Sequence, residues 1–308
     1  MYQIFETIVF LIIVGIVVLV VAKLFMRDLR RKYDINIGRR MFITSLIVAF
    51  LMLLLISSIF LSSKYRYSHE YYRDISSGVF LSEIFLTIPT RRTRFSVEEA
   101  LLNRKSIREW RKDPVHIDDL SMILWAAYGV VENIYGWYRR TSPSAGATYP
   151  MEIYVVVGER SVATSQGFLE PGSYKYDPIR HSIKLIKKGD LRNDLYIASL
   201  DQEWVRDAPV SIVICAVHRR TTRVYGERGF RYVYMEAGHV GQNIYLMATA
   251  LGLGTVAVGA FYDDVVAKII GASSDEEPLY IFPIGVPNIR FVNSFEYIER
   301  FYGEMRSG

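Results

Sequence analysis

The sequence predicts an α+β domain preceded by two transmembrane helices. Two long apolar runs, 7–25 and 41–61, predict the membrane helices. Further along the chain, helical and strand-like patterns follow one another irregularly. A doubly wound sheet would show a steady strand–helix repeat, so this irregular order favours the α+β class. The expected organisation is a transmembrane hairpin over 1–62, a linker over 63–93 and one domain over 94–308.

The two apolar runs have the length that a membrane span requires. Each has about 20 residues, and a helix of that length crosses a hydrocarbon core of about 30 Å. A long helix in a globular domain normally has a polar stripe, and neither run has one. Glu6 precedes the first run where a signal peptide would have a basic segment. The sequence therefore predicts a membrane location, with lipid as a partner.

The linker and the start of the domain contain helix signals of different strength. The linker, 63–93, is rich in Tyr, Ser and Arg, and we expect one short helix in it, over 79–86. Ser96 followed by Glu99 forms a capping box, in which each side chain satisfies a backbone N–H group of the helix start. This pattern predicts a helix over 97–103.

The rest of the domain alternates between apolar strands and amphipathic helices. A helix is expected over 117–128, where Gly129 supplies the C-terminal stop. The longest helix is expected over 232–251 and has apolar residues on almost every side, which predicts burial on several sides. Further helices are expected over 191–200 and 264–270, and strands over 152–157, 174–176, 182–186, 210–217, 255–259 and 280–286.

Composition excludes several classes of site. Cys215, the single cysteine, lies in the apolar run 210–217 and is expected to be an inert core thiol. The 5 histidines are scattered without ligand spacing, so no metal site is expected. The net charge of +5 is explained by basic residues near the apolar runs, and we expect no nucleic-acid partner.

Two loops have compositions that suit a ligand. Arg104-Lys105-Ser106-Ile107-Arg108 offers three cations and a hydroxyl, which suits an anion with several oxygens, although a solvated basic turn would look the same. The loop from Pro143 to Pro150 has consecutive small residues, which let a backbone approach a flat ligand closely, although an ordinary tight loop is the alternative.

Taken together, these stretches resemble the nitroreductase superfamily, and specifically its SagB-type, azoline dehydrogenase-like branch. The resemblance extends in collinear order over about 94–288, which is almost the whole domain after the linker. The segments that carry it include NRKSIREW at 103–110, ILWAAYGV at 123–130, PSAGATYP at 143–150, QEWVRDAPV at 202–210, the long segment 225–261 and EEPLYIFPIGVP at 276–287.

The resemblance implies a nitroreductase-like FMN-binding fold, with a mixed sheet surrounded by helices. It also implies a homodimer with two FMN sites at the subunit interface, and NAD(P)H as the electron donor. Arg104, Ser106 and Arg108 would hold the phosphate and ribityl chain, and Lys105 would lie near the N1–O2 edge of the ring. One side of the ring would be lined by Pro143, Ser144, Ala145 and Gly146. Backbone N–H groups of Gly259 and Ala260 would point to N5 and O4 of the ring. Arg290 would be a further phosphate ligand.

One position departs from the family pattern. Azoline-oxidising members use an adjacent Lys–Tyr pair as acid–base residues, and the matching position here reads Val224-Tyr225. Tyr225 is therefore the catalytic candidate, but its lysine partner is missing.

These features predict a membrane-anchored FMN-dependent oxidoreductase. It would pass hydride through flavin N5 from NAD(P)H to a small or quinone-like acceptor. The alternatives are a flavin-binding or degenerate domain that acts as a membrane sensor or assembly partner, and a peptide azoline dehydrogenase. Loop charges place the domain outside the cell by the positive-inside rule, whereas the supply of flavin and nicotinamide favours the inside, so both orientations stay open.

Overall fold

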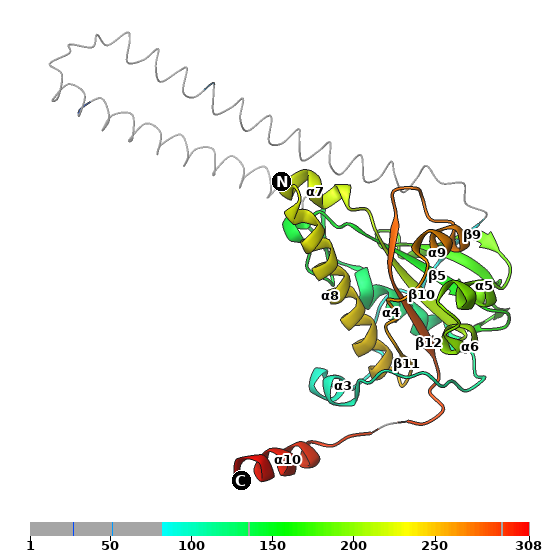
Figure 1. Ribbon diagram of the computed structural model, residues 1–308, viewed down its shortest axis with the longest axis vertical. Coiled ribbons are helices and arrows are strands. Elements are labelled where there is room, and N and C mark those ends of the chain that lie inside the picture. Colours follow the sequence, from blue (N-terminus) through cyan, green and yellow to red (C-terminus); the bar gives the residue numbers. More distant parts are fainter. Residues whose placement is uncertain (1–26, 28–50, 52–81, 135, 291, 308) are drawn as a thin grey trace. The chain divides into compact units, whose positions relative to one another are not determined.

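A seven-stranded sheet forms the centre of the fold (Figure 1). The computed structural model describes Arg27, Leu51, 82–134, 136–290 and 292–307, and the elements below all belong to the compact unit Gly78–Gly308. The strand order is β1-β9-β8-β5-β10-β12-β11, and every pairing in this sheet is antiparallel. The strands are β1 (Ser82–Phe85), β5 (Met151–Val157), β8 (Gly172–Asp177), β9 (Ser182–Lys188), β10 (Val210–Ala216), β11 (Gly254–Thr255) and β12 (Glu277–Gly285).

The two central strands, β5 and β10, are buried along their whole length. Side chains in a strand alternate between the two faces, and both faces here contact apolar clusters. Ile153 and Val155 of β5 belong to one cluster, whereas Tyr154 and Val156 belong to the other. A strand covered on both faces needs a continuous apolar run, which explains the sequence of β5.

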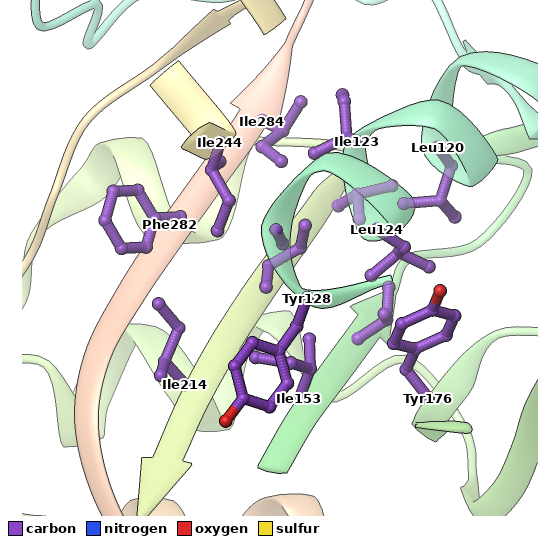
Figure 2. Packing of buried hydrophobic residues seen from close by; sticks show 14 of the residues in the cluster. Leu120, Ile123, Leu124, Tyr128, Ile153, Tyr176, Ile214, Ile244, Phe282 and Ile284 are labelled. Carbon is purple, nitrogen blue, oxygen red and sulfur yellow. The ribbon is translucent and has the colours of Figure 1, made fainter. Parts of the chain in front are cut away.

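Helices cover the two faces of the sheet as separate layers. On one side, α4 (Ile117–Tyr128) and α8 (Arg228–Ala250) pack on the larger cluster, and Figure 2 shows Leu120, Ile123 and Ile244 among its labelled members. The opposite layer consists of α5 (Arg192–Ala198), α6 (Glu203–Asp207) and α9 (Asp263–Ile270), as Figure 1 shows. The molecule is thus a three-layer α+β fold.

Local capping signals placed two helices correctly. The helix α3 (Val97–Asn103) begins after Ser96, and both hydrogen bonds of the capping box are present. At the end of α4, the N–H group of Gly129 donates to the carbonyl of Trp125. The expected bounds of α3 and α4 are confirmed, because each depends on side chains within a few residues.

The structure differs from the expected elements where distant pairing decides the conformation. The short helix expected over 79–86 is wrong: β1 is an edge strand that pairs with β9, and its Ile84 packs on the core. The main sheet is antiparallel where a mixed sheet was expected. A parallel pair, β2 with β6, lies in a small sheet. The remaining elements are β2 (Val115–His116), β3 (Val130–Ile134), β4 (Trp137–Arg140), the single turn Ala145–Ala147, β6 (Val162–Thr164), β7 (Gly167–Phe168), α7 (Arg219–Tyr225) and α10 (Phe295–Ser307).

The predicted membrane location is corrected. Across the described ranges, none of the helices combines the length and the apolar character that crossing a bilayer needs. The longest of them, α8, has 23 residues but carries Arg228, Arg231 and Glu236, and buried charges are expensive in hydrocarbon. The two apolar runs on which the prediction depended, 7–25 and 41–61, lie outside the described residues except for Leu51.

Candidate active site

The basic segment, Arg104–Arg108, is held against β11. The N–H group of Ile107 donates to the carbonyl of Thr255 at 2.9 Å, and Ser106 forms a parallel bridge with the same residue. A Cβ atom on Gly254 would lie 2.8 Å from the Cβ of Ile107, which is closer than such atoms approach in proteins. Glycine at 254 is therefore what allows the segment to pair this closely.

Tyr245 of α8 connects the basic segment to the loop that follows β11. Its hydroxyl lies 3.0 Å from the Oγ of Ser106 and accepts the N–H group of Ala257 at 2.8 Å. The guanidinium of Arg104 lies over its ring, 5.1 Å from the centroid. Sequence reasoning missed Tyr245, because one tyrosine in a long apolar helix carries no local signal.

Gly259 and Ala260 are exposed at the end of this loop. The side-chain amide of Gln202 donates to the carbonyl of Ala260 at 3.0 Å and to that of Ser199 at 2.7 Å. Two residues further on, the ring of Trp204 lies under the guanidinium of Arg108, at 5.4 Å. Gln202, which precedes α6, therefore contacts the loop, and Trp204 within α6 contacts the basic segment. The sequence did not indicate either contact.

Lys105 and Arg290 line one cavity of about 400 Å³. The guanidinium of Arg290 lies against Gly252, where a Cβ atom would be 3.2 Å from the nearest guanidinium nitrogen. Both residues are exposed. The structure thus brings Arg290 near the basic segment.

The small-residue loop, Pro143–Pro150, is fixed by side chains from α7. The hydroxyl of Thr148 donates to the carbonyl of Ala145 and lies 2.8 Å from the hydroxyl of Thr221. The guanidinium of Arg220 donates to the carbonyl of Tyr149 at 3.1 Å and pairs with Glu152. Because these anchors are buried, the loop is a rigid part of the fold.

Tyr225, the catalytic candidate, lies against Gly146 of this loop. A Cβ atom at Gly146 would be 2.6 Å from the Tyr225 hydroxyl, and the φ angle of Gly146 is +58°. Both facts explain why this position is glycine, since other residues rarely adopt this conformation. The ring of Tyr225 also packs edge-on against Tyr232, and the preceding Val224 is exposed.

A buried acid, Glu236 of α8, lies beneath the same loop. It accepts a hydrogen bond from the hydroxyl of Tyr128 at 2.5 Å. Burial raises the pKa of Glu236 to about 7, although the hydroxyls of Ser144 and Tyr128 and the nearby charge of Arg140 act in the opposite direction. Glu236 could not be recognised from the sequence, because α8 carries several polar and charged side chains and Glu236 does not stand out among them.

The structure therefore places the predicted site residues in two groups. Arg104 to Arg108, Gly259, Ala260 and Arg290 surround β11, and the small-residue loop lies beside Tyr225. The groups contact α8 at Tyr245 and Glu236 respectively. These residues are nine positions apart, which is about 14 Å along a helix.

Comparison with known proteins shows the family of this chain. A model of the nitroreductase family matches residues 101–286, which is more than half of the chain, and the chain belongs to this family. A protein of Methanocaldococcus jannaschii described as a nitroreductase is 50% identical over 189 residues, which cover 61% of this chain and 90% of that protein.

Two further matches, one to a solved structure and one to a sequence, were also found. A crystal structure described as a nitroreductase from Ralstonia eutropha has a TM-score of 0.58 and 30% identity, covering 69% of this chain and 93% of that one. The microcin B17-processing protein of Escherichia coli is 28% identical over 135 residues, covering 43% of this chain and 48% of that protein. The family consists generally of flavin-dependent oxidoreductases, which typically use FMN with NAD(P)H. The resemblance to the family stated from the sequence is confirmed.

Proposed function

We propose that this protein is an FMN-dependent oxidoreductase that passes hydride from NAD(P)H to a small or quinone-like acceptor. The observation that carries the proposal is the position of Tyr245, which ties Ser106 of the basic segment to Ala257 of the loop after β11. Cations for a phosphate and exposed small residues for a planar ring thus lie in one neighbourhood. Family membership supports the same activity.

The residues around β11 fit FMN by charge and by shape. Arg104, Ser106 and Arg108 would hold the phosphate and ribityl chain, since arginine binds phosphate through paired hydrogen bonds. Lys105 and Arg290 add positive charge along the cavity that they share. Gly259 and Ala260 carry no bulky side chain, so their backbone N–H groups would be able to approach the ring.

The chemistry itself would come from the flavin, which supplies a hydride acceptor and donor when bound. The protein would bind and orient it: Pro143, Ser144, Ala145 and Gly146 would line the ring. Tyr225 would donate a hydrogen bond to the substrate, because its hydroxyl lies directly over Gly146.

The proposal includes a homodimer. Part of α8 is exposed, and Tyr234 and Met235 are about half exposed on it. A Cβ atom added at Gly238, on the same part of the helix, would meet nothing within 4 Å. Exposed Tyr and Met side chains beside an open glycine are typical of an interface between subunits, although the same side of α8 also carries Arg231 and His239. Light scattering of the wild type should give twice the mass of one chain, and Met235→Glu should shift the protein to a monomer.

The direct test of the proposed function is the visible spectrum of the purified protein, followed by anaerobic addition of NADH and of NADPH. We expect flavin absorbance that is bleached by at least one of the two nucleotides and restored by a quinone. A protein that binds no added FMN would instead favour a degenerate domain. A protein that binds FMN but passes no electrons to any quinone would exclude that acceptor class.

Oxidation of a peptide azoline is the second candidate. Similarity to the microcin B17-processing protein and the position of Tyr225 over Gly146 favour it. Val224 counts against it, because the lysine of the family's Lys–Tyr pair is missing. If Val224→Lys oxidises a peptide azoline and the wild type does not, the wild-type chain transfers hydride to a small or quinone-like acceptor instead.

A further inference from the structure

The loop after β11 is fixed by hydrogen bonds on both sides of Gly259. On the side nearer β11, Val258 forms two backbone hydrogen bonds with Ile281 of β12, at 2.8 Å and 2.9 Å. On the other side, the carbonyl of Ala260 accepts the side-chain amide of Gln202 at 3.0 Å. One side of the glycine is thus held by the sheet, and the other side is held by a single side chain.

Between these two attachments, Gly259 and Ala260 have open N–H groups. Neither N–H group donates to another group within the ranges that the structure describes, and both residues are exposed. A Cβ atom at Gly259 would have the ring of Tyr280 as its nearest neighbour, at the ordinary contact distance of 3.7 Å. The fold therefore leaves room for a side chain at this position, and glycine instead suits a ligand that approaches the backbone closely.

The peptide group between Gly259 and Ala260 carries the second of these open donors. Its orientation depends on the peptide groups before and after it. The one before is fixed by the sheet, because the carbonyl of Val258 accepts the N–H group of Ile281. The one after is fixed by Gln202, and the glycine between them is conformationally permissive. Without Gln202, the N–H group of Ala260 would therefore lose its fixed direction.

Gln202 is itself held by the turn between α5 and α6. The second hydrogen of its amide is donated to the carbonyl of Ser199, at the end of α5, at 2.7 Å. The two residues between them, Leu200 and Asp201, have φ angles of +58° and +56°. Side chains other than glycine rarely adopt this conformation, and such strain is found where the surrounding structure fixes a functional position. The strained turn places the amide of Gln202 between α5 and the loop.

We propose that Gln202 is a positioning residue for the flavin ring: its amide fixes the peptide group that presents the N–H group of Ala260 to the ring. The inference rests on the proposed function, in which the N–H groups of Gly259 and Ala260 approach the ring. Gln202 acts through the carbonyl of Ala260, so its loss weakens the contact with the ring and leaves the contact with the phosphate unchanged.

Loss of the Gln202 amide should weaken binding of every ligand that contains the ring. Gln202→Met keeps the approximate length of the side chain and removes both donors. One neutral hydrogen bond changes an equilibrium by up to about tenfold. Affinity for FMN, riboflavin and lumiflavin should therefore fall by the same factor, because the three share the ring and differ only in the ribityl and phosphate groups. Arg104→Ala should instead reduce the affinity for FMN alone.

The test is titration of the full chain with the three flavins, followed by quenching of flavin fluorescence. Gln166→Met is the matched control: it makes the same replacement at an exposed glutamine between β6 and β7, and it should leave all three affinities unchanged. Gln202→Glu removes both donors when ionised and should match Gln202→Met, which keeps the inference testable if the methionine variant does not fold. If a folded variant binds riboflavin and lumiflavin as the wild type does, or loses affinity for FMN alone, the role of Gln202 is wrong and the flavin site stands.

Amide hydrogen exchange of the wild type provides a second measurement that needs no substitution. The N–H groups of Gly259 and Ala260 should exchange rapidly without ligand and become protected when riboflavin binds. Gln202→Met should reduce this protection at Ala260, whereas a merely structural role would lower the urea midpoint and leave the protection unchanged. If riboflavin binds and protects neither N–H group, these donors do not contact the ring and the inference fails. If the wild type binds no flavin, the proposed function fails and this inference fails with it.

Discussion

The basic segment and the small-residue loop would hold two ends of one ligand, yet they are built in opposite ways. The basic segment is fixed by backbone pairing with β11 and one hydroxyl contact, while Lys105 and Arg108 remain exposed. The small-residue loop is fixed by buried side chains, including Arg220 and Thr221. Substitutions in the first region should therefore change binding, whereas those beneath the second should change stability and pH dependence.

The largest expected effect tests the anchor beneath the loop. Arg220→Ala would leave Glu152 buried without one of its two cations, since Arg220 and Lys175 both pair with it. Breaking a buried pair costs about 3–5 kcal/mol. Urea unfolding should show that loss. The neighbouring Arg219→Ala removes an exposed pair with Asp275 and should cost less than about 1 kcal/mol. Equal losses in the two variants would show that burial does not distinguish these arginines.

The next prediction concerns stability against pH. The pKa of Glu236 is raised from 4.5 to about 7 by burial, so the folded protein binds a proton that the unfolded chain has released. Its contribution to stability is fully present below pH 4.5 and is lost as the pH rises through 7, by about 3 kcal/mol in total. The free energies of unfolding of wild type and Glu236→Gln should therefore diverge over this range. Parallel curves would show that Glu236 titrates normally.

Substitutions in the basic segment should change FMN affinity rather than stability, unlike those at Arg220 and Glu236. Arg104→Ala should weaken FMN binding by about 1.5–3 kcal/mol, because it removes a charge-assisted contact to phosphate. Its midpoint in urea should stay close to that of the wild type, since the segment is held through its backbone. Arg111→Ala, which removes an exposed arginine paired with Asp113, is the control and should leave FMN affinity unchanged. If Arg104→Ala lost stability and kept its FMN affinity, the basic segment would have a structural role and not a binding role.

The smallest effect is expected at the contact between the loop and Tyr225. Gly146→Ala should cost about 1–2 kcal/mol from its positive φ angle alone, and the contact with Tyr225 adds to this. Gly136→Ala is a control with a positive φ angle and nothing within 4 Å, so it isolates the conformational part. Adding Tyr225→Ala to Gly146→Ala should restore part of the extra loss in the free energy of unfolding. If it restores none, there is no steric contact between the two positions.

The central strands and the helices α3, α4, α5, α8 and α9 could be predicted because their signals are local or periodic. The capping box at Ser96 fixed the bounds of α3, and the apolar run 210–217 fixed the position of β10. By contrast, β1 and the β3–β4 hairpin went unrecognised, because their strands depend on partners elsewhere or on a turn of weak composition.

For the candidate site too, some residues could be predicted from the sequence and others could not. Residues of the two loops were found through composition and family resemblance, and the structure groups Arg290 with the basic segment. The supports of the site were missed, since Tyr245, Trp204 and Glu236 act through contacts over long sequence separations. A polar residue in an apolar helix looks the same in the sequence whether it supports a site or faces solvent.

The most direct test of the central claim is the ratio of FMN to riboflavin affinity, measured by titration of the purified protein near neutral pH. These ligands differ only in the phosphate that Arg104, Ser106 and Arg108 would bind. Charge-assisted contacts of about 1.5–3 kcal/mol predict that FMN binds roughly 10 to 150 times more tightly, and that Arg104→Ala reduces this ratio. Equal affinity for the two ligands in the wild type would contradict the assignment of the basic segment as a phosphate site.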